Sequence, residues 1–198
     1  MRSVGLDFDN TLVDYTEVFR AEAASFGLAA GPLDKTEIRD RLRTRGPGGE
    51  IEWQKVQARV YGPGLEQAPM MDGSRAFLER AADAGAQLAV VSHKGQFAAQ
   101  DPGGTDLRDA ARRWLRRHCP EIPAERIFFE DERVGKLRRI EALGLTHFID
   151  DLPEVLSDPT FPPTVQRLWL VTRAGTVRPP GVLAAGGWRD LADVVFGR

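Results

Sequence analysis

The sequence predicts an α/β protein: a Rossmann-like three-layer core with a mainly parallel sheet, plus a small all-helical domain. Two observations predict the core. Short apolar runs alternate with amphipathic segments, and several of these runs end in polar residues. A third observation predicts the second domain, because residues 14–69 show helical periodicity only. We therefore expect a core domain over 1–13 and 70–198 and a helical domain over 14–69.

The composition is that of a globular protein. The 198 residues are 42% hydrophobic and 28% charged, and the formal net charge is -2. This balance gives no general attraction to nucleic acid polymers or membranes, and no apolar window is long enough to cross a bilayer. Cys119 is the single cysteine, so an intrachain disulfide is excluded, and no apolar signal segment precedes the first strand. We expect a soluble cytoplasmic protein that is a monomer or a homodimer.

The chain opens with a predicted buried strand over 3–8, which is short, apolar and closed by an acidic turn. Three helical pieces then follow, over about 14–26, 36–42 and 50–60. Gly27 can end the first piece, and Asp34 or Thr36 can act as the N-cap of the second. The block is much longer than one crossover connection needs, so we interpret it as an insertion after the first strand.

The third helical piece carries Ile51, Val56 and Val60 on its predicted apolar side, with Trp53 near the edge of that side. Gly46-Pro47-Gly48-Gly49 separates it from the second piece. Two interpretations of this Gly-rich stretch remain open: a plain turn between helices, or a mobile loop that enters the active site.

The remainder of the chain alternates helices with strands. The predicted helices are 74–84, 106–118, 134–143 and 188–196. The predicted strands are 86–91, 126–129, 147–149 and 167–171. This alternation is typical of a parallel sheet with helices on both faces.

Polar residues follow three of the predicted strands. Asp7 and Asp9 close the first strand, Ser92 follows the second, and Asp150 and Asp151 follow the fourth. Ligands of open parallel sheets bind at the carboxyl ends of the strands, so we expect these side chains to converge. A pair of carboxylates can bind a hard cation, and one member can act as a nucleophile while the other moves protons.

The order of these residues carries a resemblance to a known family. Asp7-Phe8-Asp9-Asn10-Thr11 has the form DxDxT, Ser92 ends the next strand, and Lys136 precedes the acidic pair Asp150-Asp151. Lys136 is also the only lysine between Lys94 and the end of the chain. Over roughly residues 4–152 the chain resembles the haloacid dehalogenase-like (HAD) superfamily, most of whose members are magnesium-dependent phosphatases.

The resemblance implies hydrolysis of a small phosphorylated metabolite through an aspartyl phosphate. Asp7 would be the nucleophile, and Asp9 would be the general acid and base. Lys136 would neutralise charge on Asp7 and on the transferred group. Ser92 would hold phosphoryl oxygens, and Thr11 would hold the turn and orient Asp9.

The resemblance also implies a Mg²⁺ site. Its ligands would be the Asp7 carboxylate, the Asp9 backbone carbonyl, Asp150, and Asp151 directly or through water. The acid at position 9 indicates phosphate ester cleavage, because the dehalogenase and phosphonatase branches lack it. The helical insertion resembles the cap domain with which the family selects its substrates.

Several assignments have an alternative interpretation. His93 and Lys94 follow Ser92 and either line the substrate site or form a solvated turn. Residues Arg41, Arg43, Arg45, Trp53 and Lys55 either contact an anionic substrate or form polar faces of short helices. At the level of function, phosphoryl transfer as in the mutase branch is one alternative. A non-catalytic binding module that kept the fold is another.

Overall fold

The computed structural model describes residues 1–29, 31–172 and 175–197. The chain forms two compact units. The first, called the sheet unit, consists of Met1–Val13, Met70–Lys94 and Leu115–Arg198. The second, called the helical unit, consists of Asp14–Pro69 and Gly95–Trp114. The expected division was a core domain over 1–13 and 70–198 and a helical domain over 14–69, whereas residues 95–114 belong here to the helical unit.

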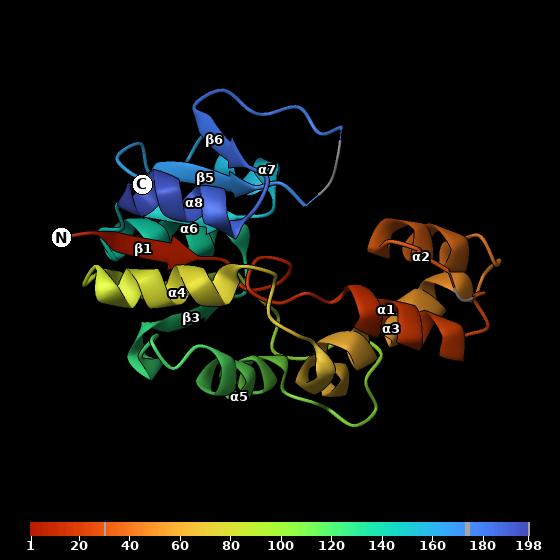
Figure 1. Cartoon of the computed structure of the whole chain (residues 1–198). Helices are drawn as coiled ribbons and strands as arrows, with labels where there is room; N and C mark the ends of the chain where they lie inside the picture. Colours follow the sequence, from red (N-terminus) through yellow and green to blue (C-terminus); the bar gives the residue numbers. More distant parts are fainter. Residues whose placement is uncertain (30, 173–174, 198) are drawn as a thin grey trace. The chain divides into compact units, whose positions relative to one another are not determined.

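Within the described residues, the sheet unit contains a six-stranded parallel sheet in the order β3-β2-β1-β4-β5-β6 (Figure 1). The strands are β1 (Ser3–Leu6), β2 (Gln87–His93), β3 (Ile127–Glu130), β4 (His147–Asp150), β5 (Gln166–Leu170) and β6 (Val182–Ala185). The predicted α/β class and parallel sheet are therefore confirmed. Sequence analysis missed β6, a four-residue edge strand whose two middle residues are exposed.

Strand β1 lies between β2 and β4, and its Leu6 pairs with Val90 on one side and Ile149 on the other. From β1 the chain continues outward to β2 and β3, and it then returns to β4 before continuing to β5 and β6. The order of the strands therefore reverses beside β1. Ligands of open α/β sheets bind at such a switch point, outside the carboxyl ends of the strands.

Helices cover both faces of the sheet (Figure 1). Helices α4 (Ser74–Asp83) and α8 (Trp188–Phe196) pack together on one face, and α6 (Arg133–Ala142) and α7 (Pro153–Leu156) cover the other. Gly5 of β1 shows how closely the second face is packed. A Cβ atom at Gly5 would lie 2.4 Å from Leu145 Cδ1, so a larger residue would displace the core beneath β1.

The remaining helical segments are three helices between β1 and β2, helix α5, and two short 3-10 helices. Their bounds are α1 (Thr16–Ser25), α2 (Lys35–Arg43), α3 (Gly49–Tyr61), η1 (Pro63–Gln67), α5 (Leu107–His118) and η2 (Ala124–Arg126). Of the two predicted N-caps, Asp34 and not Thr36 caps α2: its carboxylate accepts from the Glu37 N–H, and the Glu37 carboxylate accepts from the Asp34 N–H.

An aromatic cluster forms the centre of the helical unit. Trp53 stacks on Phe19 with ring centroids 5.7 Å apart and is only 3% exposed. The prediction that Trp53 lies near the edge and Ile51 on the apolar side of α3 was wrong, because Ile51 is 45% exposed. The buried face follows Trp53, Val56 and Val60, which have i, i+3 and i+7 spacing, and Ile51 lies off this stripe.

The Gly-rich stretch 46–49 connects α2 to α3. Gly46 has a φ of +96°, and a Cβ at Gly49 would lie 2.2 Å from the Leu42 carbonyl oxygen. The turn itself therefore accounts for both glycines. The hypothesis that this loop enters the active site stays a prediction.

Two antiparallel segments connect the helical insertion to the sheet unit. Val13 and Met70 form an antiparallel bridge, and the Met71 N–H donates to the Leu12 carbonyl at 2.7 Å. The Asp14 N–H donates to the Pro69 carbonyl at 3.0 Å. The point where the chain leaves the sheet unit therefore lies beside the point where it returns.

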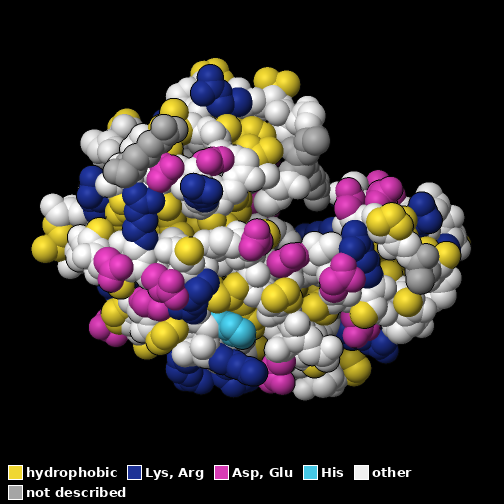
Figure 2. Space-filling model, in the orientation of Figure 1, with side chains coloured by type: hydrophobic (Ala, Val, Ile, Leu, Met, Phe, Trp, Pro, Cys, Tyr) yellow, Lys and Arg dark blue, Asp and Glu magenta, His cyan; other side chains and the backbone are white. Residues whose placement is uncertain are grey.

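Charged side chains of both signs are mixed over the face shown in Figure 2. This mixture agrees with the small formal net charge of -2. No helix among the described residues has both the length and the apolar character needed to span a membrane. Cys119 is buried, and burial raises the pKa of its thiol to about 12, so the thiol is unreactive at neutral pH.

Candidate active site

The first part of the site is a tight turn after β1. Phe8 is fully buried, and its carbonyl accepts from the N–H groups of Leu12 and Val13 at 3.0 and 3.2 Å. Asn10 has a φ of +58°, which turns the chain sharply between Asp9 and the residues that follow. The turn places Thr11 back over the end of β1, where its hydroxyl reaches Asp7.

Lys136 reaches the same point from α6. Its ammonium lies 2.6 Å from Asp7 Oδ1 and 2.7 Å from Asp150 Oδ2. Lys136 is 2% exposed, and Asp150 is fully buried. Lys136 therefore lies between the two carboxylates, and its catalytic role stays a prediction. One lysine ties the ends of neighbouring strands β1 and β4 together.

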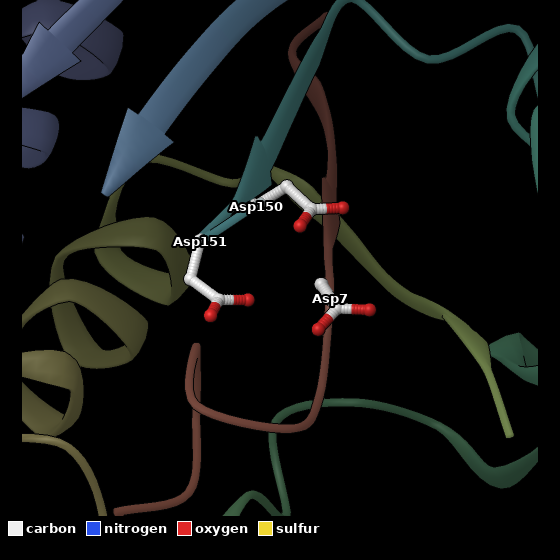
Figure 3. Close-up of side chains that lie close together, drawn as sticks. All are labelled: Asp7, Asp150 and Asp151. Carbon is white, nitrogen blue, oxygen red and sulfur yellow. The ribbon is translucent and has the colours of Figure 1, made fainter. Parts of the chain in front are cut away.

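Asp151 completes a cluster of three carboxylates (Figure 3). Asp7, Asp150 and Asp151 each offer an oxygen, and these three oxygens all lie within 4.8 Å of one another. The Thr11 hydroxyl donates weakly toward Asp7 Oδ2 at 3.5 Å and Asp151 Oδ1 at 3.4 Å. The Leu152 N–H donates to Asp150 Oδ1 at 2.9 Å.

Burial and charge set the electrostatics of this cluster. Burial raises the pKa of the Asp7 carboxyl, Lys136 lowers it and Asp150 raises it, with a resulting value of about 7. Burial opposes the charged form of Lys136, but Asp150 and Asp7 together hold the pKa of its ammonium above its ordinary value. Three clustered carboxylates carry more negative charge than one ammonium can neutralise. A cation that prefers oxygen ligands fits this donor set.

Asp9 lies next to a second lysine. The Lys94 ammonium is 3.0 Å from both carboxylate oxygens of Asp9, and Lys94 is 5% exposed. Sequence analysis considered Lys94 as a substrate contact or part of a solvated turn. Its burial excludes the solvated turn for Lys94, whereas the neighbouring His93 is exposed.

Ser92 is buried at the carboxyl end of β2, opposite Phe129 of β3. The structure thus places Ser92 at the end of a strand adjacent to β1, as its predicted role requires. Its contact with a phosphoryl group stays a prediction, as does a place for His93 in the lining of the substrate site.

Two tryptophans support the site, and sequence reasoning missed both. The Trp188 Nε1–H donates to the Thr11 carbonyl at 3.3 Å, and the Trp169 Nε1–H donates to the Asp151 carbonyl at 3.1 Å. Both indoles are buried. No local pattern could have revealed them, since Trp188 is 177 residues from Thr11 in the sequence.

Comparisons with known proteins identify solved structures of similar fold. No model of a protein family matches the sequence, and no curated protein matches it. Similar solved structures include a putative phosphatase from Clostridium difficile, with 11% identity, 98% coverage of both chains and a TM-score of 0.66. A HAD-superfamily hydrolase of subfamily IA, variant 1, from Geobacter sulfurreducens PCA has 14% identity and a TM-score of 0.62, covering 98% of this chain and 96% of that one.

A predicted phosphatase from Clostridium acetobutylicum is also similar, with 15% identity and a TM-score of 0.62 over 100% of this chain and 99% of that one. The parallel sheet and the acidic cluster at its switch point define an α/β protein with a carboxylate site. More particularly, the chain has the fold of the HAD-superfamily hydrolases. The fold implied by the sequence resemblance is therefore confirmed.

Proposed function

We propose that this protein is a Mg²⁺-dependent phosphatase that hydrolyses a small phosphate monoester through an aspartyl phosphate. The convergence of Asp7, Asp150 and Asp151 around the buried Lys136 carries the proposal. A carboxylate nucleophile needs positive charge beside it to approach an anionic phosphate, and this site offers both a fixed ammonium and a cation-binding donor set.

The residues that would hold Mg²⁺ are the carboxylates of Asp7 and Asp150, with Asp151 binding directly or through water. The backbone carbonyl of Asp9 would be a further ligand, as the family resemblance implies. When bound, the ion offsets negative charge on the phosphate and on its attacking carboxylate. Three converging carboxylates with one ammonium leave the negative charge that such an ion requires.

In the first step, a carboxylate oxygen of Asp7 attacks phosphorus, and a new P–O bond forms as the bond to the leaving alcohol breaks. Asp9 gives its proton to the departing oxygen, so the alcohol leaves uncharged. Lys136 stays close to Asp7 throughout and stabilises the charge that the nucleophile shares with the phosphoryl group. Ser92 and backbone N–H groups after Asp7 would hold the phosphoryl oxygens.

In the second step, a water molecule attacks the phosphorus of the aspartyl phosphate. Asp9, now a carboxylate, takes a proton from this water, and the bond between phosphorus and the Asp7 oxygen breaks. Inorganic phosphate leaves and Asp7 is regenerated. Asp9 acts as the general acid in the first step and as the general base in the second, on the same side of Asp7. The DxD spacing favours this arrangement.

The helical unit is proposed to act as the cap domain that selects the substrate. Two of the arginines considered as substrate contacts pair with glutamates of the same unit. Arg43 forms an ion pair with Glu50, and Arg45 forms one with Glu52. Substrate selection would then depend on other residues of the helical unit.

The test is release of inorganic phosphate from 4-nitrophenyl phosphate, with Mg²⁺ and with EDTA, by the native chain and by Asp7→Asn. We expect metal-dependent release that Asp7→Asn abolishes. Arg117→Met removes an exposed cation of the sheet unit and is the matched control, with unchanged release expected. Measuring free phosphate also separates hydrolysis from phosphoryl transfer, in which the phosphate would appear on a second alcohol.

Absence of phosphate release from a panel of sugar, nucleotide and short-chain organic phosphates, at any Mg²⁺ concentration, would reject the proposal. Mg²⁺-independent release that Asp7→Asn retains would also reject it.

A further inference from the structure

A second buried ion pair lies beside the carboxylate cluster. The Lys94 ammonium faces both oxygens of Asp9 at 3.0 Å, so the contact is bidentate. The Lys94 side chain is 4% exposed, and the Asp9 side chain is 24% exposed. A buried ammonium costs several kcal/mol of desolvation unless a charge partner offsets it. The contact with Asp9 therefore offsets part of this cost, whereas Asp9 retains access to solvent.

Lys94 is fixed at both of its ends. Its backbone N–H donates to the Glu130 carbonyl at 3.0 Å, which continues the pairing of β2 with β3. Its ammonium lies 5.3 Å from the ring centroid of Phe8, which is fully buried and packs edge-on against Phe129 at 6.1 Å. The lysine thus offers a rigid positive charge to the turn that carries Asp9.

The two buried lysines serve different carboxylates. Lys136 contacts Asp7 and Asp150, whereas Lys94 contacts Asp9. Asp9 therefore pairs with a lysine at the end of β2 and not with Lys136, whose ammonium lies among the carboxylates proposed to bind the metal. The Asp9 carboxylate therefore has its own anchor, separate from the group proposed to attack phosphorus.

We propose that Lys94 is a positioning residue, which holds the Asp9 carboxylate where it exchanges protons with the leaving alcohol. This inference rests on the proposed phosphatase function. It differs from the sequence-based prediction that Lys94 binds the substrate directly, because here Lys94 acts through Asp9. The two roles predict different losses of kcat/KM for different substrates when Lys94 is replaced.

Two substrates with the same ring separate these roles: 4-nitrophenyl phosphate and phenyl phosphate. Phenolate is the stronger base, so its departure depends on a well-placed proton donor, whereas 4-nitrophenolate departs with little help. Lys94→Met should lower kcat/KM for phenyl phosphate by at least about tenfold. For 4-nitrophenyl phosphate the expected loss is below about threefold, because attack by Asp7 is unaffected.

Asp9→Asn provides the reference for complete loss of the proton donor. It should show the same selective loss on phenyl phosphate, and adding Lys94→Met to it should lower kcat/KM no further. Lys94→Arg keeps the charge with a longer side chain and should recover part of the loss. This variant also covers the case in which Lys94→Met fails to fold, which circular dichroism would detect.

Equal losses on both substrates, with a raised KM, would overturn the inference and show direct contact between Lys94 and the phosphoryl group. An additive loss in the double variant would overturn it as well. If the native chain releases no phosphate from either substrate or from the panel of sugar, nucleotide and short-chain organic phosphates, the proposed function itself fails, which is a different result from an equal loss.

Discussion

The ammonium of Lys136 lies 2.6 Å from Oδ1 of Asp7, and both side chains are almost completely buried. The lysine comes from α6 and the aspartate from the end of β1, 129 residues apart in the sequence. The contact affects both stability and chemistry, because burial raises the pKa of the Asp7 carboxyl to about 7 while the Lys136 ammonium beside it favours the charged form.

Replacing Lys136 with Met should destabilise the protein. The variant leaves the carboxylates of Asp7 and Asp150 without their ammonium partner, at an expected cost of about 3–5 kcal/mol in the free energy of unfolding near pH 8. Urea denaturation in EDTA measures this cost. Lys136→Arg keeps a positive charge and should lose less. Equal stabilities of the native chain and Lys136→Met would contradict this role.

The stability of the native chain should fall relative to Asp7→Asn as the pH rises from about 4 to 7. The raised pKa of about 7 means that native Asp7 keeps its proton, whereas the unfolded chain releases it near 3.8. The native state then binds more protons in this interval, so rising pH favours unfolding.

We expect the advantage of Asp7→Asn over the native chain to grow by at least about 1 kcal/mol between pH 4 and pH 8, since a tenfold change in proton affinity is worth about 1.4 kcal/mol. Urea titrations in EDTA at both pH values provide the measurement. A constant difference between the two proteins would show that the Asp7 carboxyl titrates normally.

Mg²⁺ should stabilise the native chain through the carboxylate cluster. An ion that binds only the folded state at 100 times its Kd adds about 2.7 kcal/mol of stability. Asp151→Asn should reduce this gain, measured as the rise in Tm with MgCl₂ at pH 8. The exposed Asp190 of α8 is the matched site, and Asp190→Asn should keep the full rise. Identical rises in both variants would place the ion elsewhere.

Asn10 should tolerate glycine and reject a β-branched residue. Its φ of +58° lies in the left-handed region, which Gly and Asn adopt readily and Val does not. The free energy of unfolding of Asn10→Gly should therefore lie within about 1 kcal/mol of the native value. Asn10→Val should lower this free energy by about 1–3 kcal/mol. Thermal denaturation followed by circular dichroism compares them, and full stability of Asn10→Val would contradict a strained turn.

Trp188→Phe should loosen the turn from outside the site. The indole donates to the Thr11 carbonyl and packs edge-on against Phe77 with centroids 4.9 Å apart. Phenylalanine keeps an aromatic contact but leaves that carbonyl without this donor, at an expected cost of about 1–3 kcal/mol in unfolding free energy. Phe77→Leu tests packing alone. Urea denaturation measures the loss, and a larger loss of unfolding free energy in Trp188→Phe than in Phe77→Leu would assign the effect to the hydrogen bond.

The sequence predicted the parts of the fold that depend on local pattern. The 188–196 helix matches α8, and one of the two predicted N-caps, Asp34, caps α2, because periodicity and capping act within a few residues. The DxDxT motif and the acidic pair located Asp7, Asp150 and Asp151, since polar residues after apolar strands gather at one edge of a parallel sheet.

Features that depend on distant packing could not be predicted this way. Strand β6 is too short and too exposed to show a strand pattern, and its place in the sheet comes from its pairing with β5. The bidentate contact of Lys94 with Asp9 depends on how β1 and β2 lie side by side. Trp188 likewise reaches Thr11 only through tertiary structure.

The bridge between Val13 and Met70 bears on how such a protein can diversify. The two ends of the insertion lie side by side in space, so the insertion is a closed loop on the sheet whatever its length or sequence. A recombination event could exchange residues 14–69 for a shorter or longer cassette while the strand pairing on either side stays in register. The turn after β1 and residues 14–69 could therefore change at separate rates during evolution.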